Sequence, residues 1–342
     1  MTLHSETRLN ELAQTARAGV EPATAERFDR LFQSVDAQRA WASFACDKPA
    51  WLYLNPLRSP QEQQARSLQE LSDAGIGLAQ HAVVRGAYRT PPTDRAVLSR
   101  SGPVNDGRAY IQGLSSRVAC DALRVEAADH VLDLCAAPGG KTLRLAAQAG
   151  DSGHVVAVEP TANRKHRLLA NLRRCGADGV EVVGRDGRSV GRSHAQRFDK
   201  ALVDAPCSGE ARWAVRRADP QSDANPTEPL LAYRPGRSRR LAAIQTALLL
   251  SAIQATRPGG VVVYTTCTLA PEENESVVDR VLKRSPRPVQ IDAIPLGHWP
   301  RARLAPRAEW NERRYHPSMR GAARLAPDPE HDAVFACRLR VG

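Results

Sequence analysis

The sequence predicts an α/β fold whose larger part is a parallel sheet with helices on both faces. Two observations predict it. From about residue 128 onward, short apolar strand-like segments alternate with helix-like ones, and a turn of small residues at 133–142 follows the first strand. Alternation at this spacing is typical of parallel sheets with covering helices. In such folds the ligand binds beyond the carboxyl ends of the strands, where the loops gather.

The elements of this sheet are short and regularly spaced. The predicted strands cover residues 130–134, 155–159, 180–183, 200–204, 260–266 and 332–339. The predicted helices cover residues 141–149, 164–175, 241–255 and 271–283. Two segments, 211–240 and 297–326, are rich in Arg and Pro and poor in apolar residues, so we expect irregular loops or segments that order on binding.

The chain is long enough for more than one domain. Residues 1–40 show helical spacing of apolar residues, and 41–125 read as a small α+β region with strands at 51–54 and near 78–84 around a helix ending near 75. We place the larger domain at 126–342. These three parts define the expected organisation.

The amino-acid composition indicates which kinds of partner the protein binds. The 342 residues carry 48 Lys and Arg against 37 Asp and Glu, a net charge of +11. This charge favours a polyanionic partner such as nucleic acid or an acidic membrane surface, although an arginine-rich proteome would produce the same balance. No apolar run approaches the ~20 residues of a membrane span. We therefore expect a cytoplasmic protein with no membrane association.

The seven cysteines include no pair at CxxC spacing, so neither a disulfide framework nor a zinc site is expected. Cys120, Cys135 and Cys337 fall in apolar runs and are predicted to be buried core thiols. Cys207 and Cys267 differ, because each follows a predicted strand in a polar context. Burial by packing is a weak explanation for those two.

The turn at 133–142, Asp-Leu-Cys-Ala-Ala-Pro-Gly-Gly-Lys-Thr, matches neither the GxGxxG fingerprint nor the GxxxxGK[ST] phosphate loop. It suits a nucleoside with a short charged tail. Glu159 ends the second strand, where an acid can accept from a ribose diol, and Asp186 follows the third, where it could accept from an adenine amino group. A solvated acid and an Asp in a Gly-rich turn are the respective structural alternatives. Lys141 could contact a cofactor carboxylate or orient Asp204, and Asn274 could cap a helix or line the site.

Four motifs together resemble the Nop/Sun RNA cytosine-5 methyltransferases. They are DLCAAPGGKT at 133–142, DAPCSG at 204–209, TTCTLAPEENESVV at 265–278 and GRAYIQGLSS at 107–116. The resemblance runs from about residue 100 to the C-terminus. It implies a Rossmann-like class I methyltransferase sheet, a small N-terminal α+β RNA-binding region, and a monomer that methylates carbon 5 of cytosine in RNA, with rRNA favoured over tRNA.

The resemblance also implies the site residues. Cys267 would be the nucleophile that attacks carbon 6 of the base, Cys207 would aid release of the product, and Asp204 would reach the N3 edge of the ring. S-adenosylmethionine would be held by Ala136, Ala137, Pro138, Gly139, Gly140, Lys141, Glu159, Arg164, Asp186 and Asp204.

RNA is expected to follow the arginine-rich segment after Cys207. Arg212, Trp213, Arg216 and Arg217 combine charge with an aromatic ring that can stack on a base. This segment departs from the family pattern, which usually has a second glycine and an Arg-Arg pair soon after Gly209. Two rival functions remain at this stage, an RNA-binding assembly factor and a small-molecule methyltransferase. The two thiols disfavour the first and the basic charge disfavours the second.

Overall fold

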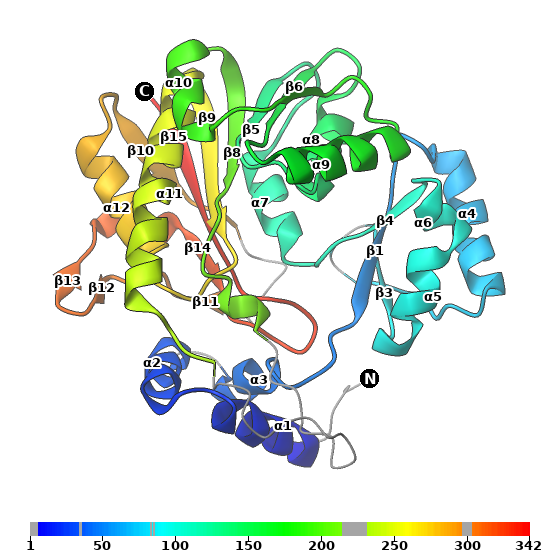
Figure 1. Cartoon of the computed structure of the whole chain (residues 1–342), viewed down its shortest axis with the longest axis horizontal. Helices are drawn as coiled ribbons and strands as arrows, with labels where there is room; N and C mark the ends of the chain where they lie inside the picture. Colours follow the sequence, from blue (N-terminus) through cyan, green and yellow to red (C-terminus); the bar gives the residue numbers. More distant parts are fainter. Residues whose placement is uncertain (1–5, 34–35, 83, 85, 214–230, 296–302) are drawn as a thin grey trace.

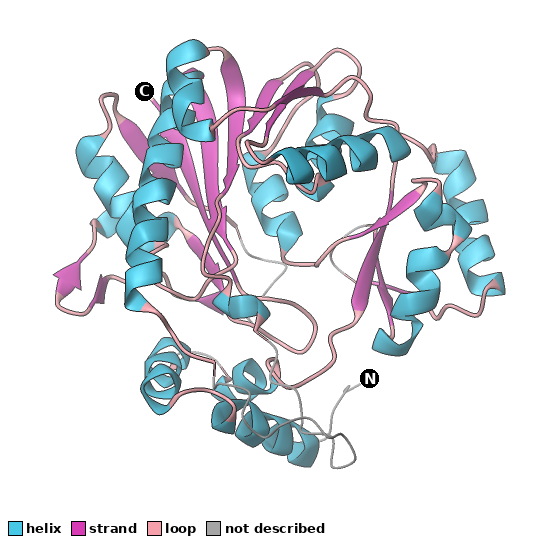
Figure 2. Ribbon diagram, viewed as in Figure 1, coloured by secondary structure: helices cyan, strands magenta, loops and turns pink. Residues whose placement is uncertain are grey.

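The computed structural model describes the chain except for residues 1–5, 34–35, 83, 85, 214–230 and 296–302. It has three parts: a group of N-terminal helices, a small sheet with its own helices, and a large sheet with helices on both faces (Figures 1 and 2). Among the described residues, no helix is long and apolar enough to cross a membrane.

Half of the large sheet is parallel, as the sequence predicts. Strands β5 (His130–Asp133), β6 (His154–Val158), β7 (Glu181–Val183), β8 (Phe198–Asp204) and β9 (Thr256–Thr266) lie in the order β7-β6-β5-β8-β9. Each pairs with its neighbours in parallel. The sheet therefore brings the loops that follow β5, β6, β8 and β9 to one edge.

The other half of the large sheet is antiparallel, which corrects the expectation for 332–339. Strand β15 (Val334–Val341) runs antiparallel to β9, because the chain enters it from the neighbouring antiparallel strand β14 (Ala323–Leu325) and not from a helical crossover. Strands β10 (Val289–Asp292) and β11 (Arg303–Leu304) complete it by pairing with β15 and β14.

The irregular loop expected at 297–326 is wrong for residues 303–326. Besides β11 and β14, this stretch holds the paired strands β12 (Glu309–Trp310) and β13 (Arg313–Arg314) and the 3-10 helix η4 (Pro317–Gly321). Trp310, Met319 and Leu325 are buried in it. A few buried side chains thus anchor a segment whose overall composition is polar.

Helices cover both faces of the large sheet and bury two apolar cores. Helices α11 (Pro235–Ala255) and α12 (Glu275–Arg284) pack on one face, and α7 (Ser116–Leu123) and α8 (Gly140–Ala149) on the other. α9 (Ala162–Arg174) extends the second layer. The remaining short helices of this part are α10 (Val190–Ser193), η2 (Gly187–Ser189) and η3 (Glu210–Arg212).

The small region is an antiparallel sheet in the order β2-β3-β1-β4. Its strands are β2 (Ala79–Gln80), β3 (Ala87–Thr90), β1 (Ala50–Leu54) and β4 (Ala109–Ile111), and its helices are α4 (Gln61–Asp73), η1 (Pro92–Asp94), α5 (Arg95–Arg100) and α6 (Gly102–Asn105). The single strand expected at 78–84 is wrong, since β2 ends at Gln80 and the chain turns back into β3 through Gly86, whose φ is +73°.

The N-terminal helices lie against the large domain. Helices α1 (Glu6–Ala18), α2 (Pro22–Phe32) and α3 (Ala37–Ala42) share an apolar cluster with residues far along the chain, among them Trp213, Trp310 and Tyr315. Arg27 of α2 also forms an ion pair with Glu272 at 2.6 Å. Helix α7 falls inside the predicted 41–125 region but packs on the large sheet. The domain boundaries at 40 and 125 stay predictions.

Candidate active site

The site lies where four parallel strands end. β5 ends at Asp133 and leads through a tight turn into α8, β6 leads into Glu159, β8 ends at Asp204, and β9 ends at Thr266. Asp204 is in register with Thr265, so the loops that carry Cys207 and Cys267 leave neighbouring strands at the same level. The convergence follows from the parallel pairing.

The two thiols that the sequence singles out are brought together. Cys207 Sγ lies 3.2 Å from Cys267 Sγ, and both side chains are partly exposed. A hydrogen bond from the Cys207 thiol lowers the pKa of Cys267; burial opposes this, and the Arg212 guanidinium assists it. The same hydrogen bond, together with burial, raises the pKa of Cys207 well above that of a free thiol. The pair therefore favours a Cys267 thiolate beside a protonated Cys207, and the thiolate is the nucleophilic form.

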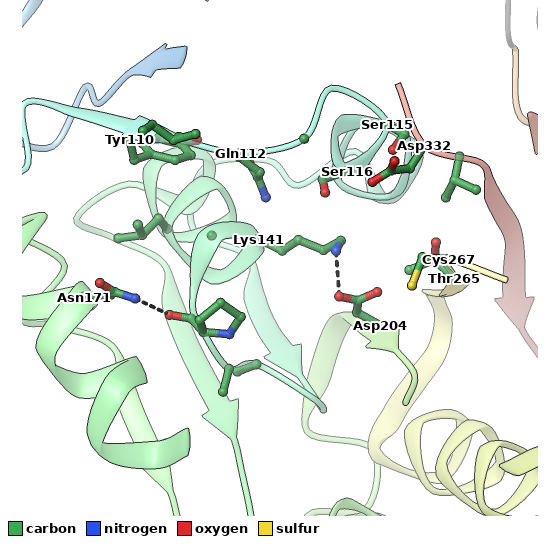
Figure 3. Close-up of a pocket in the computed structure, with 18 of the residues that line it drawn as sticks. Tyr110, Gln112, Ser115, Ser116, Lys141, Asn171, Asp204, Thr265, Cys267 and Asp332 are labelled. Carbon is green, nitrogen blue, oxygen red and sulfur yellow. Dashed lines mark hydrogen bonds and ion pairs between the residues drawn. The ribbon is translucent and has the colours of Figure 1, made fainter. Parts of the chain in front are cut away.

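An ion pair lies beside the thiols. Lys141 Nζ is 2.6 Å from Asp204 Oδ2 (Figure 3). Burial alone would lower the pKa of Lys141, but the Asp204 carboxylate outweighs it and raises the pKa. Of the two roles that the sequence leaves open for Lys141, this structure places it on Asp204.

Asn274 holds the residues on either side of Cys267. Its Oδ1 accepts a 2.5 Å hydrogen bond from Thr266 Oγ1, and its Nδ2 donates to the Thr268 carbonyl at 3.0 Å. Asn274 is 0% exposed and stands at the N-cap of α12 without a capping hydrogen bond from its side chain. It neither caps by its side chain nor lines either of the cavities described below, so its contribution is to hold the loop that carries Cys267.

Glu273, which the sequence analysis missed, ties the two cysteine loops together. Its buried carboxylate accepts hydrogen bonds from Ser208 N and Gln245 Nε2, both at 2.9 Å. Gln245 Nε2 also donates to the Pro206 carbonyl. No local signal marks this role, because Glu273 and its two partners lie in three separate segments of the chain.

Two cavities meet at these residues. One has a volume of about 560 Å³ and the other about 430 Å³. Asp204, Arg212 and Cys267 line both. The larger opens over Lys141, Gln112, Ser115 and Asp332, whereas the smaller extends towards Glu159, Asp186 and Leu248. Cys267 thus lies where the two cavities meet.

The smaller cavity contains the residues expected to hold a cofactor. Glu159 is 1% exposed, its Oε1 accepts from Thr161 N, and its Oε2 lies 3.0 Å from Arg164 without hydrogen-bond geometry. Arg164 also donates to the Ala137 carbonyl at 2.9 Å. Asp186 lines the cavity but is paired with Arg188 at 2.6 Å, which lowers the pKa of Asp186.

The turn from β5 to α8 brings its backbone close to both cavities. Gly139 adopts φ +111°, which disfavours a side chain, and a Cβ on Gly140 would lie 3.0 Å from the Gln112 amide. Ala136, Ala137 and Pro138 complete the turn and line the larger cavity. The glycines leave room that substituted residues would fill.

The structure describes two further residues that the sequence singles out, Cys135 and Trp213. Cys135, expected in the core, is partly exposed and lines both cavities, because β5 ends two residues before it. Trp213 packs its ring against Phe28, 5.7 Å between centroids, so the structure shows a packing contact and its stacking on RNA stays a prediction. Arg216 and Arg217 lie outside the described residues. No cluster of three or more His, Cys, Asp or Glu in the described part of the chain could hold a metal ion.

The sheet and the strand-end site define a class I, Rossmann-like methyltransferase fold. A methyltransferase homologue from Pyrococcus horikoshii shares it with a TM-score of 0.75 and 24% identity, covering 98% of this chain and 99% of that one. NSun6 from the same organism, solved with SFG, has a TM-score of 0.70 at 18% identity and covers 92% of this chain and 96% of that one.

The family model of the 16S rRNA methyltransferases RsmB/F matches residues 120–340, and the chain belongs to this family. Ribosomal RNA small subunit methyltransferase F of Klebsiella pneumoniae is 42% identical over 193 residues, which cover 56% of this chain and 38% of the relative. The Escherichia coli protein of that name is 40% identical over the same length. The chain thus spans under two fifths of the length of these curated relatives.

Proposed function

We propose that this protein transfers a methyl group from S-adenosylmethionine to carbon 5 of a cytosine in RNA, and that its substrate is small-subunit rRNA and not tRNA. Membership in the RsmB/F family and the names of the curated relatives support the substrate class. The observation that carries the reaction is the 3.2 Å contact between Cys207 and Cys267 beside the Asp204–Lys141 pair. A protein that only binds RNA has no use for such a pair.

The smaller cavity fits the cofactor. Glu159 Oε2 is buried without a hydrogen bond among the described residues, as an acceptor for a ribose diol would be. Ile244, Leu248 and Pro206 supply an apolar wall for the adenine ring, near Asp186. The turn from Ala136 to Gly140, with Arg164 on its Ala137 carbonyl, would follow the methionine part. When bound, S-adenosylmethionine supplies the methyl group on a sulfonium.

In the larger cavity, the Cys267 thiolate attacks carbon 6 of a cytosine that is single-stranded or flipped out. The new S–C bond places negative charge on ring N3, and Asp204 passes a proton from the paired Lys141 ammonium to N3, which neutralises that charge. Carbon 5 becomes nucleophilic and accepts the methyl group.

The product is released by elimination. The Cys207 thiol first loses its proton to solvent, and its thiolate then takes the proton from carbon 5. The electron pair forms the carbon 5–carbon 6 double bond, the S–C bond breaks to return the Cys267 thiolate, and ring N3 returns its proton to Asp204 and Lys141. Cys207 is the candidate for this step because its sulfur is nearest to the nucleophile. Once Cys267 is bonded to the base, its thiolate no longer raises the pKa of Cys207, so the Cys207 thiol loses its proton more easily.

The reaction is tested with labelled S-adenosylmethionine and total RNA from a cell that lacks this gene, followed by nucleoside analysis. We expect label in 5-methylcytidine of small-subunit rRNA. Label in 5-methylcytidine of tRNA would refute the substrate, and no label despite binding of S-adenosylhomocysteine would refute the reaction.

The two thiols are separated by substitution. Cys267→Ala should abolish methyl transfer and leave S-adenosylhomocysteine binding within twofold. Cys207→Ala should accumulate a covalent protein–RNA adduct, visible by denaturing electrophoresis, because attack survives and release does not. Cys46→Ser, a partly exposed thiol outside both cavities, serves as the control. An adduct with Cys267→Ala and none with Cys207→Ala would show that the two roles are reversed.

A further inference from the structure

The larger cavity extends well past the reactive thiol. Its volume of about 560 Å³ falls in the range of roughly 300–1,000 Å³ typical of pockets for whole drug-sized molecules, more than one pyrimidine ring requires. Figure 3 shows Tyr110 and Asn171 on the side of Lys141 away from Cys267. We call the part lined by Arg95, Val104, Tyr110, Asn171 and Arg174 the far arm.

The far arm lies between the two folded regions. Arg95 and Val104 come from α5 and α6 of the small region, whereas Asn171 and Arg174 come from α9 of the large domain. A molecule in this arm would therefore contact both regions at once. No residue that the proposed reaction uses lines it.

In the described part of the chain, no carboxylate pairs with the positive charges of the far arm. Among these residues, Arg95 is exposed and its side chain has no hydrogen bond or ion pair. Within the same described ranges, Arg174 donates only to neutral oxygens, the Val104 carbonyl and Asn171 Oδ1. Other arginines are matched with acids, for example Arg108 with Glu70 and Arg188 with Asp186.

The acids that line the rest of the cavity are already held. Asp204 is bound to Lys141, Asp332 to Lys48 at 2.6 Å, and buried Asp133 to Thr142 Oγ1 at 2.7 Å. None of these three acids forms a hydrogen bond or ion pair with Arg95 or Arg174. The far arm therefore offers two cationic donors to an anion that enters with the substrate.

The two walls of the far arm are fixed to each other. Asn55 Nδ2 donates to the Gly107 carbonyl at 2.7 Å and to the Cys175 carbonyl, directly after α9, at 2.8 Å. Gly107, at φ +79°, approaches so closely that a Cβ there would lie 2.0 Å from the Arg174 carbonyl oxygen. Arg58 adds a 3.0 Å hydrogen bond to the Arg173 carbonyl. These contacts hold Arg174 against the small region without using its charge.

We propose that the far arm binds the nucleotide next to the target cytosine, and that Arg95 and Arg174 contact the phosphate that joins the two. This inference rests on the proposed function, since it takes RNA as the substrate. The cytosine occupies the Cys267 end of the cavity, and the strand leaves across the boundary between α5 and α9. The bound RNA strand thus contacts both the small region and the large domain.

The test compares Arg95→Gln with Arg100→Gln, a control on the same helix that removes the same charge from an exposed residue outside the cavity. Affinity for a 12-nucleotide single-stranded RNA with one cytosine is measured between 50 and 400 mM salt. One lost phosphate contact lowers the slope of log K against log salt by about 0.7, which corresponds to roughly fivefold weaker binding at 0.1 M. We expect this for Arg95→Gln, a change under twofold for Arg100→Gln, and unchanged affinity for S-adenosylhomocysteine in both.

The phosphate is located by a second set of oligonucleotides, each with one uncharged methylphosphonate linkage. The linkage adjoining the cytosine should weaken binding to the wild-type protein, and it should weaken binding to Arg95→Gln by less, because only Arg174 still contacts that phosphate. Equal losses for Arg95→Gln and Arg100→Gln, additive losses in the cycle, or weaker S-adenosylhomocysteine binding would each overturn the assignment. Methylation of rRNA by the wild-type protein is measured in parallel, so that failure of the proposed function is recognised separately.

Discussion

Replacing Asn274 with alanine tests whether a buried amide positions the nucleophile. The change removes two buried hydrogen bonds and leaves Thr266 Oγ1 and the Thr268 carbonyl without this partner. A buried polar group left unsatisfied costs about 1–3 kcal/mol, so two give about 2–6 kcal/mol of unfolding free energy. Since both partners flank Cys267, the loop should also lose its fixed geometry.

The assay has two parts. Urea unfolding measures stability, and single-turnover methyl transfer measures the effect on the nucleophile, at a temperature where the variant is folded. We expect the rate of methyl transfer to fall at least tenfold while S-adenosylhomocysteine binds within twofold, because the smaller cavity does not include Asn274. Asn105→Ala, which removes an exposed hydrogen bond to the Arg100 carbonyl, is the matched control.

Two results would refute this reasoning. A stability loss below 1 kcal/mol would mean that water replaces the amide at little cost. A normal transfer rate in a destabilised but folded variant would mean that the loop geometry does not depend on Asn274. Asn274→Asp adds a graded test, since it keeps the acceptor for Thr266 and places an oxygen against the Thr268 carbonyl.

The remaining predictions concern ionisation at the site. Burial raises the pKa of Asp133 to about 6, so the contribution of Asp133 to stability should fall by about 3 kcal/mol as pH rises from 4 through 6, because the unfolded carboxyl ionises first. The difference in urea-unfolding free energy between the wild type and Asp133→Asn should change by this amount over that range, and a constant difference would contradict it. Iodoacetamide should alkylate Cys267 before Cys207, with an apparent pKa below that of a free thiol, as peptide mass mapping across pH would show; preferential labelling of Cys207 would contradict the assignment. Arg212→Gln should move the alkylation profile of Cys267 to higher pH, and no shift would mean that the guanidinium does not stabilise the thiolate.

Much of the site is predictable from the sequence because the end of an apolar run marks the end of a strand. Apolar runs that stop at Asp133, Asp204 and Thr266 identify loops that a parallel sheet must bring to one edge. That argument places Cys207 and Cys267 in the same neighbourhood without any knowledge of their distance. The same reasoning fails for β15, since an apolar run carries no information about strand direction.

Other features have no local signal. Lys141 pairs with Asp204, Asn274 forms hydrogen bonds to both neighbours of Cys267, and Glu273 links two loops. Each of these contacts joins residues whose distance is decided by packing. Trp213 illustrates the reverse case, because its polar, basic surroundings indicate an exposed ring, whereas the N-terminal helices supply an apolar cluster for it.

The sequence by itself determined the alternating α/β pattern, the strand-end motifs and the identity of the two thiols, because each is written in contiguous residues with a period or spacing of their own. Only the tertiary structure decided that half of the sheet is antiparallel, that the two sulfurs lie 3.2 Å apart, and that Arg95 and Arg174 line one arm of a cavity. Those facts depend on how segments that are far apart in the sequence pack against each other, and no short stretch of sequence contains them.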